Sequence, residues 1–188
     1  MTPADHAHAQ ETAITGFLVE AIDAVLDRPP MRWMQFYSVY DDPPVNEPKW
    51  RWQRRAGRSR KRVDIRIDCA ETSPRTRFRF ECKRLGRGHP AANYLGADGL
   101  GCFLRAEYAR EDTRAGMLGY VQSDNEEKWA GKIEAAIASA EDHYAIQHDS
   151  PWRHEPVINE LMHTYRSGHS RGRGRRPIEI SHTLLRFR

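Results

Sequence analysis

The stretch RVDIRIDCAETSPRTRFRFECKRL, residues 62–85, contains two runs in which apolar and charged residues alternate. Alternation with a period of two is typical of β-strands, because successive side chains of a strand point to opposite faces. We therefore predict strands over residues 62–70 and 76–83. The intervening residues 71–75 contain Ser-Pro and are few enough to join the two strands as a hairpin.

Charged side chains collect on one face of this predicted hairpin. Glu81 and Lys83 are two residues apart, so they lie on the same face of their strand, about 7 Å apart. Strand pairing can bring Asp64 or Asp68 beside Glu81, and the sequence leaves these two aspartates as alternatives. Neighbouring carboxylates destabilise a sheet unless a cation lies between them, and oxygen ligands with open positions suit Mg²⁺ or Mn²⁺. We therefore expect a metal site suited to phosphodiester hydrolysis.

The segments around the hairpin predict an α/β fold. Apolar residues recur every three or four positions over residues 11–27, which predicts an amphipathic helix. On this helix Glu11 falls within the apolar sector, whereas Glu20 faces solvent. The other expected elements are strands over 31–40, 115–123, 161–167 and 178–187, and helices over 100–108 and 125–146.

The composition is that of a globular protein. The chain has 188 residues, 39% of them hydrophobic, which suffices for one domain over residues 1–188 with a flexible segment at 1–10. No stretch approaches 18 consecutive apolar residues and no signal peptide is visible, so we expect a cytoplasmic protein without membrane contact. The three cysteines and nine histidines lack metal-ligand spacing, so neither disulfides nor a zinc site is expected.

Basic residues are concentrated in two segments, residues 49–62 and 166–176, which hold 13 of the 30 Lys and Arg. The rest of the sequence contains 17 Lys and Arg but 26 Asp and Glu, so it is net acidic. Arginine-rich segments next to Trp50 and Trp52 can neutralise phosphates and stack on bases, although such segments also serve simply as solvated loops. The residues we predict to contact nucleic acid are Arg51, Arg54, Arg55, Arg58, Arg60, Lys61, Arg62, Arg171, Arg173, Arg175 and Arg176.

Several other polar and aromatic residues allow a functional or a structural interpretation. Polar side chains near the second basic segment can line a phosphate path or satisfy hydrogen bonds within the fold. Tyrosines after the hairpin can stack on bases or pack in the core. The residues in question are Ser167, His169, His182, Tyr94 and Tyr108.

The order of these elements resembles the PD-(D/E)XK nucleases, the restriction-endonuclease-like superfamily. Asp64 in RVDIRID is followed, after 16 residues, by Glu81-Cys82-Lys83, and an amphipathic helix precedes both strands. Val63 stands where the name-giving proline would be, a departure that is frequent in the superfamily. The resemblance implies an αβββαβ core over residues 11–123, with a mixed central sheet flanked by helices. It makes residues 124–188 a family-specific C-terminal addition of helix and strand that packs on the core.

The resemblance also implies a role for each residue of the motif. Asp64 and Glu81 would bind Mg²⁺ or Mn²⁺ together with the backbone carbonyl of Cys82. Glu11 would assist directly or through water, and Lys83 would orient the attacking water. Because nearby carboxylates favour an ammonium, we expect Lys83 to act as a charged group rather than as a general base.

Three functions follow as hypotheses. The first is a metal-dependent endonuclease, with DNA favoured over RNA as its substrate. The segments ECKRL, RAGMLGYV and SGHSR also resemble bacterial superfamily members of restriction or phage defence, which would allow a homodimer or a partner protein from a defence system. The second is a non-catalytic module of the same fold that binds nucleic acid or a partner. The third is an effector that needs a partner or an activating ligand.

Overall fold

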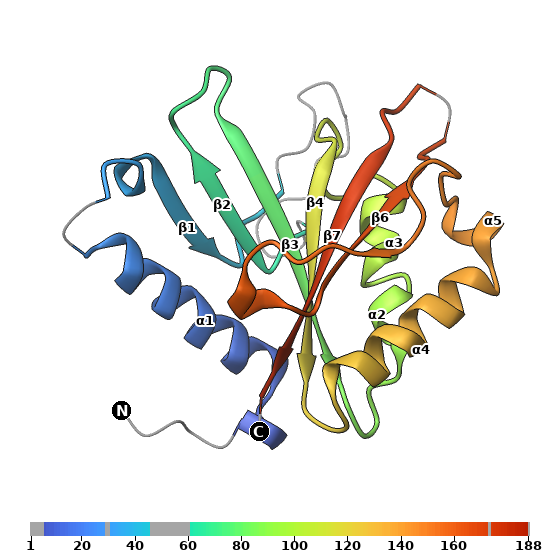
Figure 1. The fold of residues 1–188 in the computed structure, drawn as a ribbon. Coiled ribbons are helices and arrows are strands. Elements are labelled where there is room, and N and C mark those ends of the chain that lie inside the picture. Colours follow the sequence, from blue (N-terminus) through green and yellow to red (C-terminus); the bar gives the residue numbers. More distant parts are fainter. Residues whose placement is uncertain (1–5, 29–30, 46–60, 173, 188) are drawn as a thin grey trace.

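The computed structural model describes residues 6–28, 31–45, 61–172 and 174–187, which fold as an α/β structure (Figure 1). Its seven-stranded mixed sheet has the order β1-β2-β3-β4-β7-β6-β5. The strands are β1 Tyr37–Asp41, β2 Ile65–Cys69, β3 Thr76–Leu85, β4 Arg114–Val121, β5 Arg153–His154, β6 Thr164–His169 and β7 Ile178–Arg186. The α-helices are α1 Glu11–Leu26, α2 Ala91–Leu95, α3 Leu100–Leu104, α4 Glu126–Ala138 and α5 Glu141–Tyr144. The short 3-10 helices are η1 His6–His8, η2 Met34–Phe36 and η4 Asn159–Leu161.

The predicted hairpin is confirmed as the antiparallel pair β2–β3, with Ile65 opposite Phe80 and Cys69 opposite Thr76. β1 pairs antiparallel with β2, and β4 pairs parallel with β3. β7 pairs parallel with β4 and antiparallel with β6, so it lies in the middle of the sheet. The C-terminal strands therefore continue the sheet instead of only packing against it.

The strands predicted over 31–40 and 62–70 begin later than expected. The segment 31–40 begins with η2, and its extended part starts only at Tyr37. Strand β2 starts at Ile65, because Asp64 lies in a bend and its side chain, rather than its backbone, bonds to Cys82. The Asp64 carboxylate thus takes the place of the next backbone hydrogen bond between β2 and β3.

The long helix predicted over 125–146 is wrong in its second half. Helix α4 ends at Ala138, and the short helix α5 follows. Ala145 then adopts a left-handed conformation with φ of 50°, and Ile146 forms a β-bridge with His169. This turn brings the chain back to the sheet, a tertiary contact that overrides helix propensity. The helix predicted over 100–108 is also shorter, since α3 ends at Leu104.

Helices cover both faces of the sheet. Helix α1 lies on one side, whereas α2, α3 and α4 lie on the other (Figure 1). Ile14 of α1 packs with Ile65, Cys82 and Tyr120 of the sheet. The larger core on the opposite face contains residues of α2–α4 and of β3, β4 and β7, including Tyr94, Phe103, Ile133, Met117 and Ile180. Even-numbered residues of β3 thus face α1, and odd-numbered residues face the other side.

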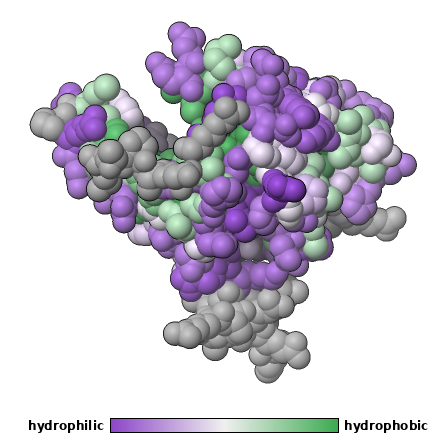
Figure 2. Space-filling model, turned by 90° about the horizontal axis from the view of Figure 1, so that it is seen from below, coloured by the Kyte–Doolittle hydropathy of each residue, from purple (hydrophilic) through white to green (hydrophobic). Residues whose placement is uncertain are grey.

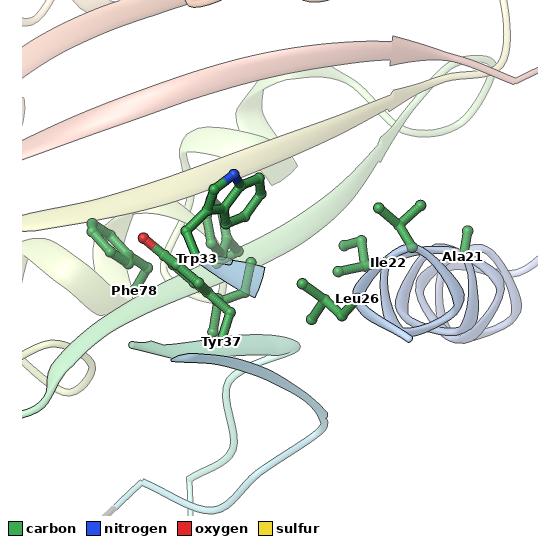
Figure 3. Close-up of a pocket in the computed structure, with 9 residues that line it drawn as sticks. Ala21, Ile22, Leu26, Trp33, Tyr37 and Phe78 are labelled. Atoms are coloured by element: carbon green, nitrogen blue, oxygen red, sulfur yellow. The ribbon is translucent and has the colours of Figure 1, made fainter. Parts of the chain in front are cut away.

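An apolar groove of about 530 Å³ separates the C-terminal half of α1 from strands β1–β3 (Figure 3). It lies on the α1 side of the sheet, because Phe78 and Phe80 point into it and alternate with Arg79 and Glu81. The groove is therefore separated by the sheet from the charged face of the hairpin. Other residues lining it are Ala21, Ile22, Leu26, Trp33 and Tyr37.

Hydrophilic residues cover most of the molecular face seen from below, with smaller hydrophobic patches between them (Figure 2). Among the helices in the described ranges, none combines the length and apolar character that crossing a membrane requires.

Candidate active site

The edge of β3 next to β2 becomes free of its strand partner after Phe80, the last residue paired with β2. Two carboxylates bind to this edge. Asp64 accepts a hydrogen bond from the backbone N–H of Cys82, with Oδ2 2.6 Å from the nitrogen. Glu11 accepts one from the backbone N–H of Arg84, with Oε2 3.1 Å from the nitrogen. The carboxylates thereby take the place of the missing strand.

The ammonium of Lys83 lies at the centre of this arrangement. It donates to Glu81 Oε1 at 2.8 Å, to Glu11 Oε1 at 3.1 Å and to the backbone carbonyl of Cys82 at 2.8 Å. Glu11 is the first residue of α1, 72 residues from Lys83 in the chain. The structure therefore brings together Glu11, Asp64, Glu81 and Lys83.

Burial and the neighbouring charges together shift the pKa values of these groups. The side chain of Glu81 is only 6% exposed and that of Lys83 only 15%. Burial raises the pKa of Asp64 to about 6, and burial together with the Asp64 charge raises the pKa of Glu81 to about 8. For Lys83, burial lowers the pKa, but the carboxylates of Glu81 and Glu11 outweigh it and raise the pKa overall. Lys83 is therefore an ammonium, as the sequence predicted.

One oxygen of this cluster has no hydrogen-bond partner among the described residues: Glu81 Oε2, which is buried. Within the described residues, no three or more His, Cys, Asp or Glu side chains are grouped so as to hold a metal ion by themselves. Mg²⁺ needs only one or two carboxylates, because waters and substrate phosphate complete its coordination. By donor type alone, Asp64, Glu81 and the Cys82 carbonyl suit such an ion.

Asp68, the alternative to Asp64, lies at the other end of β2. It is opposite Arg77 in the strand register, whereas Asp64 contacts Cys82. Its buried carboxylate forms ion pairs with Arg66 at 3.0 Å, Arg75 at 3.8 Å and Arg77 at 3.9 Å. Asp64, not Asp68, is thus the aspartate beside Glu81 and Lys83.

Most of the first basic segment lies outside the described residues. Lys61 and Arg62, its last two members, are described and form ion pairs: Lys61 with Glu107 at 3.3 Å and Arg62 with Asp42 at 2.5 Å. Both are partly exposed. Of the predicted nucleic-acid contacts, Arg51, Arg54, Arg55, Arg58, Arg60 and Arg173 lie outside the described residues.

The second basic segment is divided between interior and surface. Arg171 is buried, with 2% exposure, and its guanidinium donates to the backbone carbonyls of Ala109, Asp112 and Arg176. Arg175 and Arg176 are exposed, and Arg175 donates to the carbonyl of Arg105. Phosphate contact by Arg171 would require it to leave these carbonyls, two of which lie 62 and 59 residues away in the chain.

The candidate residues of the phosphate path form a buried hydrogen-bonded chain instead. The carbonyl of Tyr144 can only accept, so His169 donates to it through Nδ1 at 2.8 Å. Ser167 then donates to His169 Nε2 at 2.7 Å and accepts from His182 Nε2 at 2.8 Å. Tyr94 donates to His182 Nδ1 at 3.0 Å. Burial lowers the pKa of both histidines, which keeps them neutral. Each side chain in this hydrogen-bonded series therefore has a partner for its polar atoms. Tyr108 packs in the same core.

Replacing Ser167 by alanine should therefore lower the free energy of unfolding by about 2–4 kcal/mol, because two buried imidazole nitrogens lose their partners. Urea denaturation at pH 7.5 measures this loss. Ser139→Ala is a matched control, since the exposed Ser139 hydroxyl bonds only to the Ala136 carbonyl, and it should cost less than about 0.5 kcal/mol. Equal effects of the two substitutions would contradict a stabilising role for the buried hydrogen bonds of Ser167.

No protein-family model, curated protein or solved structure matches this chain. Its chemistry must therefore be inferred from the site. Two acidic oxygen donors, a backbone carbonyl and a permanent ammonium suit the binding of a divalent ion and the stabilisation of a phosphate anion.

Proposed function

We propose that this chain is a metal-dependent nuclease that hydrolyses phosphodiester bonds, with DNA favoured over RNA. The observation that carries the proposal is the meeting of Glu11, Asp64, Glu81 and Lys83 at the free edge of β3. These residues come from three separate segments of the chain. One oxygen of Glu81, Oε2, is buried and has no hydrogen-bond partner among the described residues.

The order of the elements supports the restriction-endonuclease-like core implied by the sequence resemblance. Helix α1 is followed by the antiparallel strands β1–β3, then by the short helices α2 and α3, and then by β4 parallel to β3. This sequence of elements agrees with an αβββαβ core. In this proposal, strands β5–β7 and helices α4 and α5 are the C-terminal addition.

The proposed roles follow from the contacts. Asp64 and Glu81 would hold Mg²⁺ or Mn²⁺ with the Cys82 carbonyl, and Glu11 would fix the position of Lys83. When bound, the ion supplies an acidified water and polarises the scissile phosphate. Lys83, which stays protonated, would stabilise the negative charge that develops on the phosphate, because fixed charges act strongly in a buried site.

A cleavage assay tests the proposal. Supercoiled plasmid, linear DNA and RNA are incubated with the protein in Mg²⁺ or Mn²⁺, and in parallel with EDTA. Cleavage that requires metal and disappears in Asp64→Asn and Glu81→Gln would support the nuclease. Nucleic-acid binding without metal-dependent cleavage of any of these substrates would favour the non-catalytic module, in which the same contacts only stabilise the edge of β3.

Two glutamates of α1 provide a matched pair for the same assay. Glu11 contacts Lys83 and the Arg84 backbone, whereas Glu20 is exposed on the same helix. Glu11→Gln should lower cleavage, and Glu20→Gln should leave it unchanged. A nuclease contaminating the preparation would respond to neither substitution.

The rate of cleavage should rise steeply with pH between 6 and 8. A carboxyl binds a cation only when it is ionised, and Asp64 and Glu81 have pKa values raised to about 6 and about 8. At low Mg²⁺ the rate should therefore fall about tenfold for each pH unit between 8 and 6. Raising Mg²⁺ should shift the profile to lower pH, because metal and protons compete for the same oxygens. A profile that does not move with Mg²⁺ would contradict this assignment.

A further inference from the structure

Four arginines lie on the hairpin face that carries the candidate site. Arg77 and Arg79 of β3 alternate with Phe78 and Phe80 and thus share a face with Glu81 and Lys83. Arg66 of β2 stands directly opposite Arg79, and Asp68 stands opposite Arg77. We call this the arginine surface, which consists of Arg66, Arg75, Arg77 and Arg79.

The arginine surface carries more positive charge than its acidic neighbours neutralise. Asp68 forms ion pairs with three of the four arginines, and Arg79 forms one with Asp112. Four cations thus meet two carboxylates. Arg75 and Arg77 are 51% and 43% exposed, and their nearest contacts to Asp68 are long, at 3.8 and 3.9 Å. Their guanidinium groups can therefore reach a ligand without losing a short ion pair.

The arrangement of charges on this surface lowers the stability of the fold. Like charges placed directly opposite each other destabilise a sheet, and Arg66 and Arg79 are such a pair. Burial, followed by the charges of Arg77 and Arg66, lowers the pKa of Arg79. Arg66 Nε and Asp68 Oδ1 are buried and form no hydrogen bond despite their 3.0 Å ion pair. An anionic ligand would reduce the repulsion among these arginines.

An aromatic ring adjoins the arginines. Tyr40 of β1 pairs with Arg66 in the sheet register, and the Arg66 guanidinium lies 4.3 Å from the centre of the Tyr40 ring. Tyr40 as a whole is 37% exposed. A guanidinium held over an aromatic face is kept in a fixed orientation. A planar guanidinium can donate two parallel hydrogen bonds to the oxygens of a phosphate.

We propose that the arginine surface binds the phosphate backbone of the nucleic-acid strand that leads into the candidate site. This inference rests on the proposed nuclease function and extends it by assigning the surface along which the substrate strand lies. Arg77 is four residues from Glu81, about 13 Å along β3. The phosphates that these arginines contact are thus expected within a few nucleotides of the bond that is cleaved.

Binding measurements without metal test this surface separately from catalysis. Fluorescence anisotropy in EDTA, with labelled 20-nucleotide single-stranded DNA, 20-bp duplex DNA and 20-nucleotide RNA, gives Kd between 50 and 200 mM salt. For Arg75→Gln/Arg77→Gln we expect roughly tenfold weaker binding at the lowest salt. The slope of log K against log salt should fall by about 1.4–1.8, the value for two phosphate contacts.

A second arginine pair provides the control. Arg153 and Arg166 are also opposite each other, on β5 and β6 at the far side of the sheet, but Glu155 and Glu179 balance them. Arg153→Gln/Arg166→Gln changes the net charge equally and should alter Kd less than twofold. Arg75→Lys/Arg77→Lys keeps the charge and should retain most of the binding. Thermal unfolding checks that each variant is folded.

The possible results separate the two proposals. Equal losses in the Arg75/Arg77 and Arg153/Arg166 variants would overturn the arginine surface, as would an unchanged salt slope in the former. Preferential binding of a polyglutamate peptide over all three nucleic acids would overturn it as well. If the surface binds nucleic acid as expected but no metal supports cleavage, the nuclease proposal fails while the binding site stands.

Discussion

Substitution of Lys83 by methionine is expected to lower the rate of phosphodiester cleavage by about 100- to 1,000-fold, the usual cost of removing one charged donor from a catalytic site. Methionine has nearly the length of lysine but neither its charge nor its hydrogen-bond donors. In the structure the Lys83 ammonium is shared among Glu81, Glu11 and the Cys82 carbonyl. No other cation contacts these three oxygens in the described part of the chain.

The same substitution should preserve or tighten metal binding. Two of the three oxygens that the ammonium now contacts belong to proposed metal ligands, Glu81 and the Cys82 carbonyl, so its charge opposes a second cation at close range. Calorimetric titration with Mn²⁺ or Mg²⁺ should show an equal or lower Kd for Lys83→Met. For Asp64→Asn it should show weaker binding, because a ligand is lost. Lys83 and Asp64 would thus be separated by metal affinity although both variants lose cleavage.

Lys132→Met is the control for this experiment. Lys132 lies on α4, where it pairs with Asp124 and covers the Trp129 ring, away from the candidate site. Its substitution should leave both cleavage and metal affinity unchanged. Normal cleavage by Lys83→Met would remove Lys83 from the mechanism. Loss of both cleavage and metal affinity would instead assign it a role in shaping the site.

Substitution of Arg171 by methionine is expected to lower the free energy of unfolding by about 3–5 kcal/mol, which for a chain of this size lowers the Tm by about 10 °C. The guanidinium satisfies three backbone carbonyls, those of Ala109, Asp112 and Arg176. Methionine fills similar space but leaves these buried and part-buried acceptors unpaired. Arg171→Lys should recover little, because one ammonium cannot point at three carbonyls in the directions of a planar fork.

Arg175→Met is the matched control, since Arg175 is exposed and its guanidinium bonds only to the Arg105 carbonyl. We expect it to cost less than about 1 kcal/mol. The nucleic-acid binding assay is run on the same two variants. If Arg171→Met stays as stable as wild type but weakens binding, then Arg171 contacts phosphate as the sequence predicted, and the three carbonyls do not depend on it.

The sequence contained enough information for the hairpin and for its charged face. Alternation with a period of two is a local property, so it predicts which side chains share a face without any knowledge of their neighbours. In the same way, the period of the first helix distinguished the inward Glu11 from the exposed Glu20. Glu11 does reach Lys83 in the structure.

The arginines illustrate what local patterns do not reveal. Arg171 stands in a glycine- and arginine-rich segment that is typical of a solvated loop, yet its partners at residues 109 and 112 bury it. Conversely, Arg77 and Arg79 look like ordinary exposed strand residues. They became a candidate surface only when the register placed Arg66 and Asp68 opposite them.

By itself, the sequence determined the α/β class, the β2–β3 hairpin and the set of charged residues on its face, because these depend on side-chain periodicity along short segments. The tertiary structure decided between Asp64 and Asp68, since both share a face and only the register and the end of β2 place Asp64 at Cys82. It also decided the central position of β7 and the burial of Ser167 and its histidines. These features depend on backbone groups that are far apart in the chain, and no local pattern encodes which of them will meet.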